Sequence, residues 1–224
     1  MTVTKAVDYQ KQLDALLSEL QKKEEKPSLL LHACCGPCSS YVLEYLAKYF
    51  AITVFYYNPN IYPPEEYFRR LNELKSFLPR FPPAREAAVK LVEAPYMPEE
   101  FYRATGVLEE KGLQTEPEKG ERCRRCYLFR LTKAYQYAAQ RGFSFFTTTL
   151  SISPFKDAKK INTIGQELQK LNSEGPQFLP SDFKKKNGFL RSLQLSKEYG
   201  LYRQDYCGCF YSKQLSEAER ERRK

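Results

Sequence analysis

The amino-acid sequence predicts an α/β fold: a Rossmann-like, three-layer domain with a mostly parallel β-sheet. Short apolar runs alternate with segments whose apolar residues recur at helical spacing along most of the 224 residues. Each run is followed by a helical segment long enough to cross back over the sheet, which is the connection that parallel strands require. A chain of this length without internal repeats is most simply organised as one domain.

Five apolar runs are the predicted strands. They cover residues 29–31, 52–57, 89–94, 143–150 and 177–179. Helices are expected after Cys38, from about Pro64, from Pro98, up to Gly142, across residues 161–171 and across residues 189–199. The Pro-rich stretch FLPRFPPAR and the polar stretch GLQTEPEKGE are predicted to be loops.

The two ends of the chain differ from its middle. Residues 1–26 lack a continuous apolar run but carry leucines at helical spacing, which predicts an amphipathic helix instead of a signal peptide. Residues 27–212 are the predicted α/β domain, and residues 213–224 are a charged C-terminal tail, expected to fray from Ser216. No apolar run approaches the roughly 18 residues needed to span a bilayer, and we therefore expect a cytoplasmic protein without a membrane partner.

The chain is basic, with 36 Lys and Arg against 27 Asp and Glu and a net charge of +9. Three basic clusters lie near loops that follow predicted strands or border cysteines. They are Arg122, Arg124 and Arg125, then Lys156, Lys159 and Lys160, and finally Lys184 to Lys186. This placement favours RNA as a partner, with an ordinary solvated surface as the alternative for any one cluster.

Seven cysteines stand at positions 34, 35, 38, 123, 126, 207 and 209. In a reducing compartment they indicate metal or redox chemistry instead of structural disulfides. The first group directly follows the first predicted strand, and open α/β sheets bind ligands beyond the carboxyl ends of their strands. Cys123 and Cys126 are three residues apart at the start of a predicted helix, so their thiols share one face. We expect the cysteine groups to converge beyond the carboxyl ends of the predicted strands.

Several kinds of site are compatible with these thiols. Cys35-Gly-Pro-Cys38 has the dithiol pattern of thioredoxins, but five further cysteines exceed what a dithiol switch needs. A structural zinc site closes with four ligands and leaves three cysteines over. An iron–sulfur cluster also takes four thiolates, and the remaining cysteines can then serve redox chemistry beside it. The first strand is not followed by a Gly-rich phosphate-binding turn, which weakens the case for ATP-dependent chemistry.

Six segments together resemble the epoxyqueuosine reductase family of the QueH type. They are LHACCGPCSS, FYYNPNIYPPEEYFRR, PEKGERCRRCYLFRL, FTTTLSISPFKD, SDFKK and YRQDYCGCF. The resemblance implies a HUP-like form of the Rossmann-like fold and cobalamin-independent reduction of epoxyqueuosine in tRNA to queuosine. It also implies a 4Fe-4S cluster, whose ligands would be Cys34, Cys35, Cys123 and Cys126. The family's redox-active pair falls on Cys207 and Cys209.

The residues allow two roles for Cys207 and Cys209. Cys207 and Cys209 can supply two electrons by closing to a disulfide. Alternatively, with Cys38 and a carboxylate such as Asp205, they could hold a second, mononuclear iron. The electron donor is not identified. Two other functions stay in view: an iron–sulfur tRNA sulfur-transfer enzyme, and a zinc-stabilised RNA-binding module without catalysis.

Polar residues after the predicted strands are candidates for substrate contacts. Asn58 and Asn60 could bind substrate or simply form a turn, and Ser151, Ser153 and Lys156 lie in the loop after the fourth predicted strand. The segment 202–204 adjoins the redox pair and could contact a base or ribose. For His32, the single histidine, we expect a satisfied core position instead of metal ligation.

Overall fold

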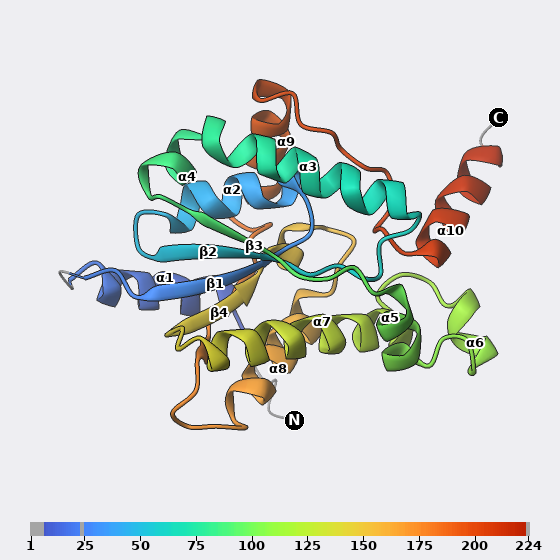
Figure 1. The fold of residues 1–224 in the computed structure, drawn as a ribbon, viewed down its shortest axis with the longest axis horizontal. Helices are drawn as coiled ribbons and strands as arrows, with labels where there is room; N and C mark the ends of the chain where they lie inside the picture. The colour runs from blue at the N-terminus through green and yellow to red at the C-terminus, as the bar shows by residue number, and fades with distance from the viewer. Residues whose placement is uncertain (1–6, 23–24, 223–224) are drawn as a thin grey trace, which may run out of the picture.

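A five-stranded parallel sheet forms the middle layer of the protein, with the strand order β3-β2-β1-β4-β5 (Figure 1). The computed structural model describes residues 7–22 and 25–222. The strands are β1 (Ser28–Ala33), β2 (Ala51–Tyr56), β3 (Lys90–Glu93), β4 (Phe145–Thr148) and β5 (Gln177–Phe178). From β1 the chain adds β2 and β3 on one side and then β4 and β5 on the other side. The point between β1 and β4, where this order switches, is where open α/β sheets bind ligands. The predicted fold class and the five predicted strands are confirmed.

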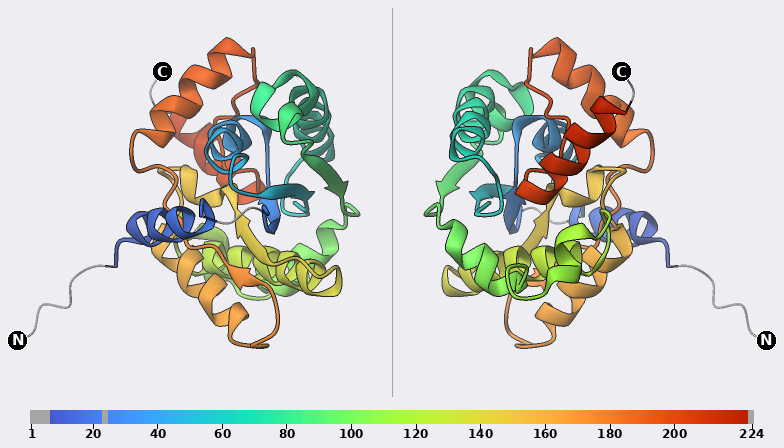
Figure 2. Two further views of the ribbon diagram at one scale, coloured as in Figure 1. Left: turned by 90° about the vertical axis from the view of Figure 1, so that its left-hand side faces the viewer. Right: turned by 90° about the vertical axis from the view of Figure 1, so that its right-hand side faces the viewer.

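Helices cover both faces of the sheet (Figure 2). One face carries α2 (Gly36–Leu46), α3 (Pro64–Arg80), α4 (Pro82–Glu86) and α9 (Gly188–Glu198). The other carries α7 (Glu121–Gln140) and α8 (Ala158–Gln169). The elements α5 (Pro98–Thr105), α6 (Lys111–Thr115) and α10 (Phe210–Glu221) lie beyond the carboxyl ends of the strands (Figure 1). Among the described residues, no helix combines the length and the apolar character needed to cross a membrane.

Strand β1 separates two apolar cores, one on each face of the sheet. Leu29 and Leu31 pack into the first core, and Leu30 packs into the second. This alternation is expected of a strand that is buried on both faces. In the pairing of β1 with β2 and β4, Leu31 lies opposite both Val54 and Thr147. The register therefore brings the carboxyl ends of these three strands to one place, which we call the mouth of the sheet.

Helix α1 (Tyr9–Leu20) belongs to the first apolar core. Three of its four leucines, at positions 13, 17 and 20, are buried against that core, and the Asp14 carboxylate accepts a hydrogen bond from the Tyr45 hydroxyl at 2.6 Å. Residues 9–20 thus form a helix that packs as part of the domain. Residues 1–6 and 23–24, which the prediction also included, lie outside the described residues.

Two stretches predicted to be loops contain helices. FLPRFPPAR covers the end of α3 and the start of α4, where two prolines occupy the first positions of the helix. Proline is tolerated there because its missing N–H would have had no partner in the helix. GLQTEPEKGE overlaps the short helix α6. Proline content alone was therefore a poor guide to loops in this chain.

Within the expected charged tail, residues 213–224, the stretch from Ser216 was expected to fray, but α10 continues to Glu221. Cys209 caps this helix, since its Sγ accepts a hydrogen bond from the Ser212 N–H at 3.4 Å. Tyr211 is buried and packs against residues from α5 and α7. The first turn of α10 is thus anchored to the domain. Residues 223–224 lie outside the described residues.

Candidate metal centre

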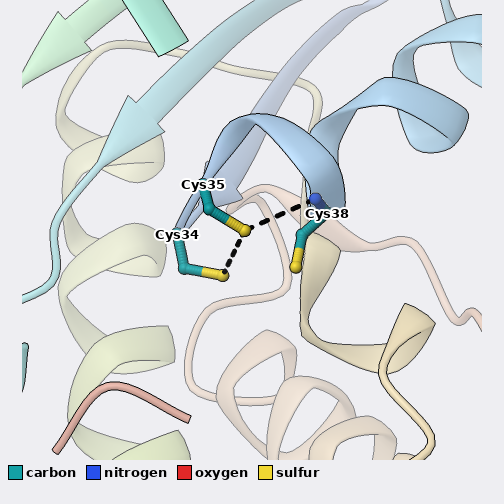
Figure 3. Close-up of side chains that lie close together, drawn as sticks. All are labelled: Cys34, Cys35 and Cys38. Carbon is teal, nitrogen blue, oxygen red and sulfur yellow. Dashed lines mark hydrogen bonds between the residues drawn. The ribbon is translucent and has the colours of Figure 1, made fainter. Parts of the chain in front are cut away.

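Three cysteine sulfurs meet where β1 ends and α2 begins (Figure 3). The Sγ atoms of Cys34, Cys35 and Cys38 all lie within 4.8 Å of one another. Cys35 is the N-cap of α2, and its Sγ accepts the backbone N–H of Cys38 at 3.4 Å. A helix N-terminus favours negative charge, but at Cys35 burial outweighs this effect and raises the pKa of the thiol. Convergent cysteine thiolates are the ligands that iron–sulfur clusters and zinc prefer.

The other cysteines surround the same mouth from different elements. Cys123 and Cys126 lie in the first turns of α7, and Cys123 packs against the apolar cluster that contains Cys34. Cys126 shares a small apolar cluster with Cys209. The three cysteine groups are therefore linked through two apolar clusters. Within the described part of the chain, however, the tightest sulfur group comprises positions 34, 35 and 38, and it does not include the α7 pair.

Arg130 is buried, and its charge interacts with Cys126 in α7 and with Cys34, which directly follows β1. It is 2% exposed, and its Nη2 donates to Asn58 Oδ1 at 2.5 Å. Burial acts to lower the pKa of the guanidinium, but the Cys126 and Cys34 thiolates outweigh it and place the pKa above its ordinary value. Its Nε has no hydrogen-bond partner among the described residues. A buried donor of this kind requires an anionic or accepting neighbour, and a thiolate-bound cluster at this position would provide one.

Lys156 and Arg70 bring two further buried cations to the mouth. Burial acts to lower the pKa of Lys156, but the thiolates of Cys207 and Cys34 outweigh burial and raise it above its ordinary value. Arg70 donates to Glu66 Oε1 at 2.6 Å and to the Cys207 carbonyl at 3.3 Å, while its Nη2 lacks a partner in the described structure. Buried cations persist when anions compensate them. This set therefore fits a group held by several thiolates.

Hydrogen bonds and burial give the thiols different pKa values. Hydrogen bonds from Cys35 and Cys38 hold the pKa of Cys34 well below its ordinary value. Burial raises the pKa of Cys35 to about 12, that of Cys123 to about 12 and that of Cys126 to about 11. Because metal binding requires thiolates, these protons must leave when a metal binds. Cys34 is consequently the thiol best prepared to become the first ligand.

The Cys207-Gly-Cys209 segment is fastened to the mouth. The Gly208 carbonyl accepts the Tyr62 N–H at 2.7 Å, and Gln204 Nε2 donates to Cys35 Sγ at 3.3 Å. Gly208 has φ of 130°, and a Cβ built on it would lie 3.1 Å from Arg70 Nη1. Glycine is therefore required here both by the backbone conformation and by the close approach of the buried guanidinium.

Cys207 and Cys209 have different surroundings. Cys207 is half-buried and its carbonyl accepts a hydrogen bond from Arg70 Nη1 at 3.3 Å, so it lies at the mouth. Cys209 is buried at the start of α10, where burial raises its pKa and Arg122 opposes that effect. The two members of the predicted redox pair therefore face different neighbours, although one glycine separates them.

Several polar candidates prove to be structural. Asn58 Nδ2 donates to the Ala33 carbonyl at 2.8 Å, and its Oδ1 accepts a hydrogen bond from Arg130. Asn58 therefore connects the end of β1 to Arg130. His32 is buried with Nδ1 2.8 Å from Thr148 Oγ1 and Nε2 3.1 Å from the Tyr57 carbonyl. Its expected role as a satisfied core residue is confirmed.

The sequence interpretation missed Arg70 and Arg130. Both lie on the buried stripes of their helices: Arg70 between Tyr67 and Leu74 in α3, and Arg130 between Cys126 and Ala134 in α7. A basic residue at helical spacing within an apolar stripe is the signal that could have revealed them.

Comparison with solved structures adds little. The U34-tRNA thiolase NcsA from Methanococcus maripaludis, solved with its [4Fe-4S] cluster, aligns with a TM-score of 0.45 and 12% identity. The alignment covers 96% of this chain and 78% of that chain. Similarity at this level carries no argument about the present protein.

Comparison with protein families is decisive. Residues 29–215 match the family model of the epoxyqueuosine reductase QueH. The epoxyqueuosine reductase QueH of Streptococcus pyogenes serotype M1 is 40% identical over 215 residues, which cover 96% of this chain and 82% of that protein. The corresponding protein of Staphylococcus epidermidis is 39% identical over 206 residues, covering 92% and 84%. That of Thermotoga maritima is 33% identical over 189 residues, covering 83% and 90%. The chain belongs to the epoxyqueuosine reductase QueH family.

Proposed function

We propose that this protein reduces epoxyqueuosine in tRNA to queuosine, the activity for which its relatives are named. The observation that supports this proposal most strongly is that cysteines from three parts of the chain share apolar clusters near the buried cations Arg70, Arg130 and Lys156. Conversion of the epoxide to an alkene removes the oxygen as water and consumes two electrons and two protons. A site for this reaction needs a redox group and nearby acids, and the mouth offers thiols for both purposes.

The proposed cofactor is a 4Fe-4S cluster bound by Cys34, Cys35, Cys123 and Cys126. Four thiolates complete the coordination of such a cluster, and when bound it supplies electrons at a potential set by its surroundings. Buried Arg130 supports this ligand set, since its charge interacts with both Cys34 and Cys126. Cys38 completes the sulfur group at the start of α2 and is left outside the proposed ligand set.

Cys207 and Cys209 are the proposed second redox group. Their oxidation to a disulfide releases two electrons and two protons, which balances the conversion of one epoxide to one alkene and one water. The overall exchange is then epoxide plus dithiol giving alkene, water and disulfide, after which an external reductant restores the thiols. A second, mononuclear iron would instead need additional ligands. Asp205 is a poor one, because it pairs with Arg220 at 2.8 Å and both side chains are 55% exposed.

The activity is tested with anaerobically prepared protein and tRNA that carries epoxyqueuosine. Iron, sulfide and zinc are measured first, and the tRNA is then incubated with the protein and a low-potential reductant such as viologen with dithionite. Digestion to nucleosides and mass spectrometry should show loss of one oxygen atom and no gain of sulfur. A sulfur-containing product would support a sulfur-transfer enzyme. A zinc-loaded protein that leaves the tRNA unchanged would contradict the proposal.

A further inference from the structure

The basic cluster beside Cys123 and Cys126 is largely neutralised by the protein itself. Arg124 pairs with Glu121 at 2.6 Å, and Arg125 pairs with Glu110 at 2.6 Å. The third member, Arg122, is buried. This cluster therefore presents little positive charge to a polyanion.

The cluster at Lys184 to Lys186 is neutralised in a similar way. These lysines pair respectively with Asp182 at 2.5 Å, Asp8 at 3.1 Å and Asp14 at 2.5 Å. Two of the pairs connect the segment before α9 to helix α1 and its N-cap. Lys185 and Lys186 thus connect α1 to the domain, and each of the three lysines has a carboxylate partner within the protein.

The third cluster lies in and after the loop that follows the 3₁₀ helix η1 (Thr149–Ile152) at the mouth. Two consecutive residues of this loop differ sharply in exposure. The Lys156 ammonium is buried beside the cysteines, whereas the Phe155 side chain is 66% exposed. Lys159 is exposed at the start of α8, and Lys160 Nζ donates to the Lys119 carbonyl at 2.5 Å. We call Phe155, Lys159, Lys160 and the exposed Lys119 the 155–160 surface.

An exposed aromatic side chain in the same short segment as an exposed lysine matches the chemistry of single-stranded RNA. Bases stack on aromatic rings, and lysines neutralise phosphates, so each component of such a strand meets its preferred partner. The position of this loop at the mouth indicates which part of the strand it contacts. Lys156 is buried and its charge interacts with Cys207, Cys34 and Cys38, so a nucleotide that reacts at the cysteines would bring the next nucleotide of its strand toward the loop that carries Phe155.

We propose that the 155–160 surface binds the unpaired loop of the substrate tRNA, with Phe155 stacking on a base next to the nucleotide that is reduced. This inference deepens the proposed function and rests on it. Lys159 and Lys160 then contact phosphates on either side of that base.

The test compares the anaerobically prepared wild type with Phe155→Ala, Phe155→Trp and Leu171→Ala. Leu171 is a matched apolar control, because it is 71% exposed and follows α8 at its far end. The probe is a synthetic tRNA stem-loop with the fluorescent base 2-aminopurine beside the reactive position. Phe155→Ala should weaken binding on the order of tenfold and abolish the quenching of 2-aminopurine that stacking causes. Phe155→Trp should restore both, and Leu171→Ala should change neither.

Two further measurements separate this inference from the proposed function. Iron and sulfide contents, and turnover of the free epoxyqueuosine nucleoside, should be the same in Phe155→Ala and wild type. Lys159→Gln should reduce the slope of log affinity against log salt by about 0.7, as expected for one phosphate contact on a single strand. Equal affinity and quenching in wild type and Phe155→Ala overturn the inference. A wild type that reduces the nucleoside but binds the stem-loop no better than an acidic peptide also overturns it, and leaves the reductase activity standing.

Discussion

The side-chain amide of Gln204 donates a hydrogen bond to Cys35 Sγ at 3.3 Å, across a sequence separation of 169 residues. The same sulfur accepts the Cys38 N–H at 3.4 Å. The C-terminal segment thus reaches back to the first cysteine group and adds an N–H donor to it. N–H donors stabilise negative charge on a cysteine sulfur, and they are one of the means by which proteins raise the reduction potential of iron–sulfur clusters.

Replacing Gln204 with Leu should therefore lower the midpoint potential of the proposed cluster while preserving its iron and sulfide. A tenfold change in the one-electron equilibrium corresponds to about 59 mV, which is the scale of shift to look for. Redox titration followed by electron paramagnetic resonance measures it. Gln194→Leu, on the exposed side of α9, is the matched control and should leave the potential unchanged. An unaltered potential in Gln204→Leu would mean that the contact to Cys35 does not tune the cluster.

The second prediction distinguishes Cys123 from Cys38. The proposed ligand set includes Cys123, although Cys38 is the residue whose sulfur lies within 4.8 Å of both Cys34 and Cys35. Cys123→Ala should lose most of the cluster's iron and sulfide, because a ligand is missing, and Cys38→Ala should retain them. Analysis of iron, sulfide and visible absorption after anaerobic purification decides between them. The opposite pattern would move Cys38 into the ligand set and Cys123 out of it.

The fold could be predicted because its signals are local. Apolar runs such as 52–57 have the length of buried strands, and the leucines of α1 repeat at helical spacing, so pattern alone identifies both. The cysteines' approach to one another was also predictable, since parallel strands bring the loops after their carboxyl ends together.

Other features depend on long-range contacts that no local pattern contains. Lys186 forms an ion pair with Asp14, and Arg125 forms one with Glu110. A cluster of basic residues in the sequence therefore did not predict a positively charged surface. Arg70 is buried because Glu66 and the Cys207 carbonyl accept its donors, and the second of these partners comes from the other end of the chain. Burial of a cation is decided by such partners, which the sequence does not place.

The third prediction concerns Cys209, which caps α10 and lies outside the group formed by Cys34, Cys35 and Cys38. Cys209→Ser should keep the cluster's iron and sulfide, because serine can still cap the helix and no proposed cluster ligand is lost. Turnover of epoxyqueuosine tRNA should fall by at least tenfold, since a serine cannot form the disulfide. Thiol titration before and after a single turnover should show two thiols consumed in wild type. Loss of the cluster in Cys209→Ser would instead identify Cys209 as a ligand.

The fourth prediction concerns Glu73, a partly buried carboxylate on α3 whose Oε1 accepts the Tyr202 N–H. Its Oε2 is buried without a partner among the described residues. Burial raises the pKa of Glu73 above the ordinary value of 4.5, and the hydrogen bond from Tyr202 only partly opposes this. Between 4.5 and the raised value, the folded state therefore holds a proton that the unfolded state has released. The stability contributed by the protonated carboxyl group is present at low pH and is lost as the pH rises through this interval.

Glu73→Gln removes this titration while its amide oxygen can still accept the Tyr202 N–H. The free energy of unfolding of Glu73→Gln, relative to wild type, should consequently increase as the pH rises from about 4.5 to about 7.5. Urea unfolding of the anaerobic proteins at several pH values in this range measures the difference. Glu86→Gln provides the control, because Glu86 is exposed and its replacement removes the same charge without relieving a buried one. A difference that stays constant with pH would show that Glu73 ionises equally in the folded and unfolded states, and a decreasing difference would mean that the folded protein stabilises its carboxylate.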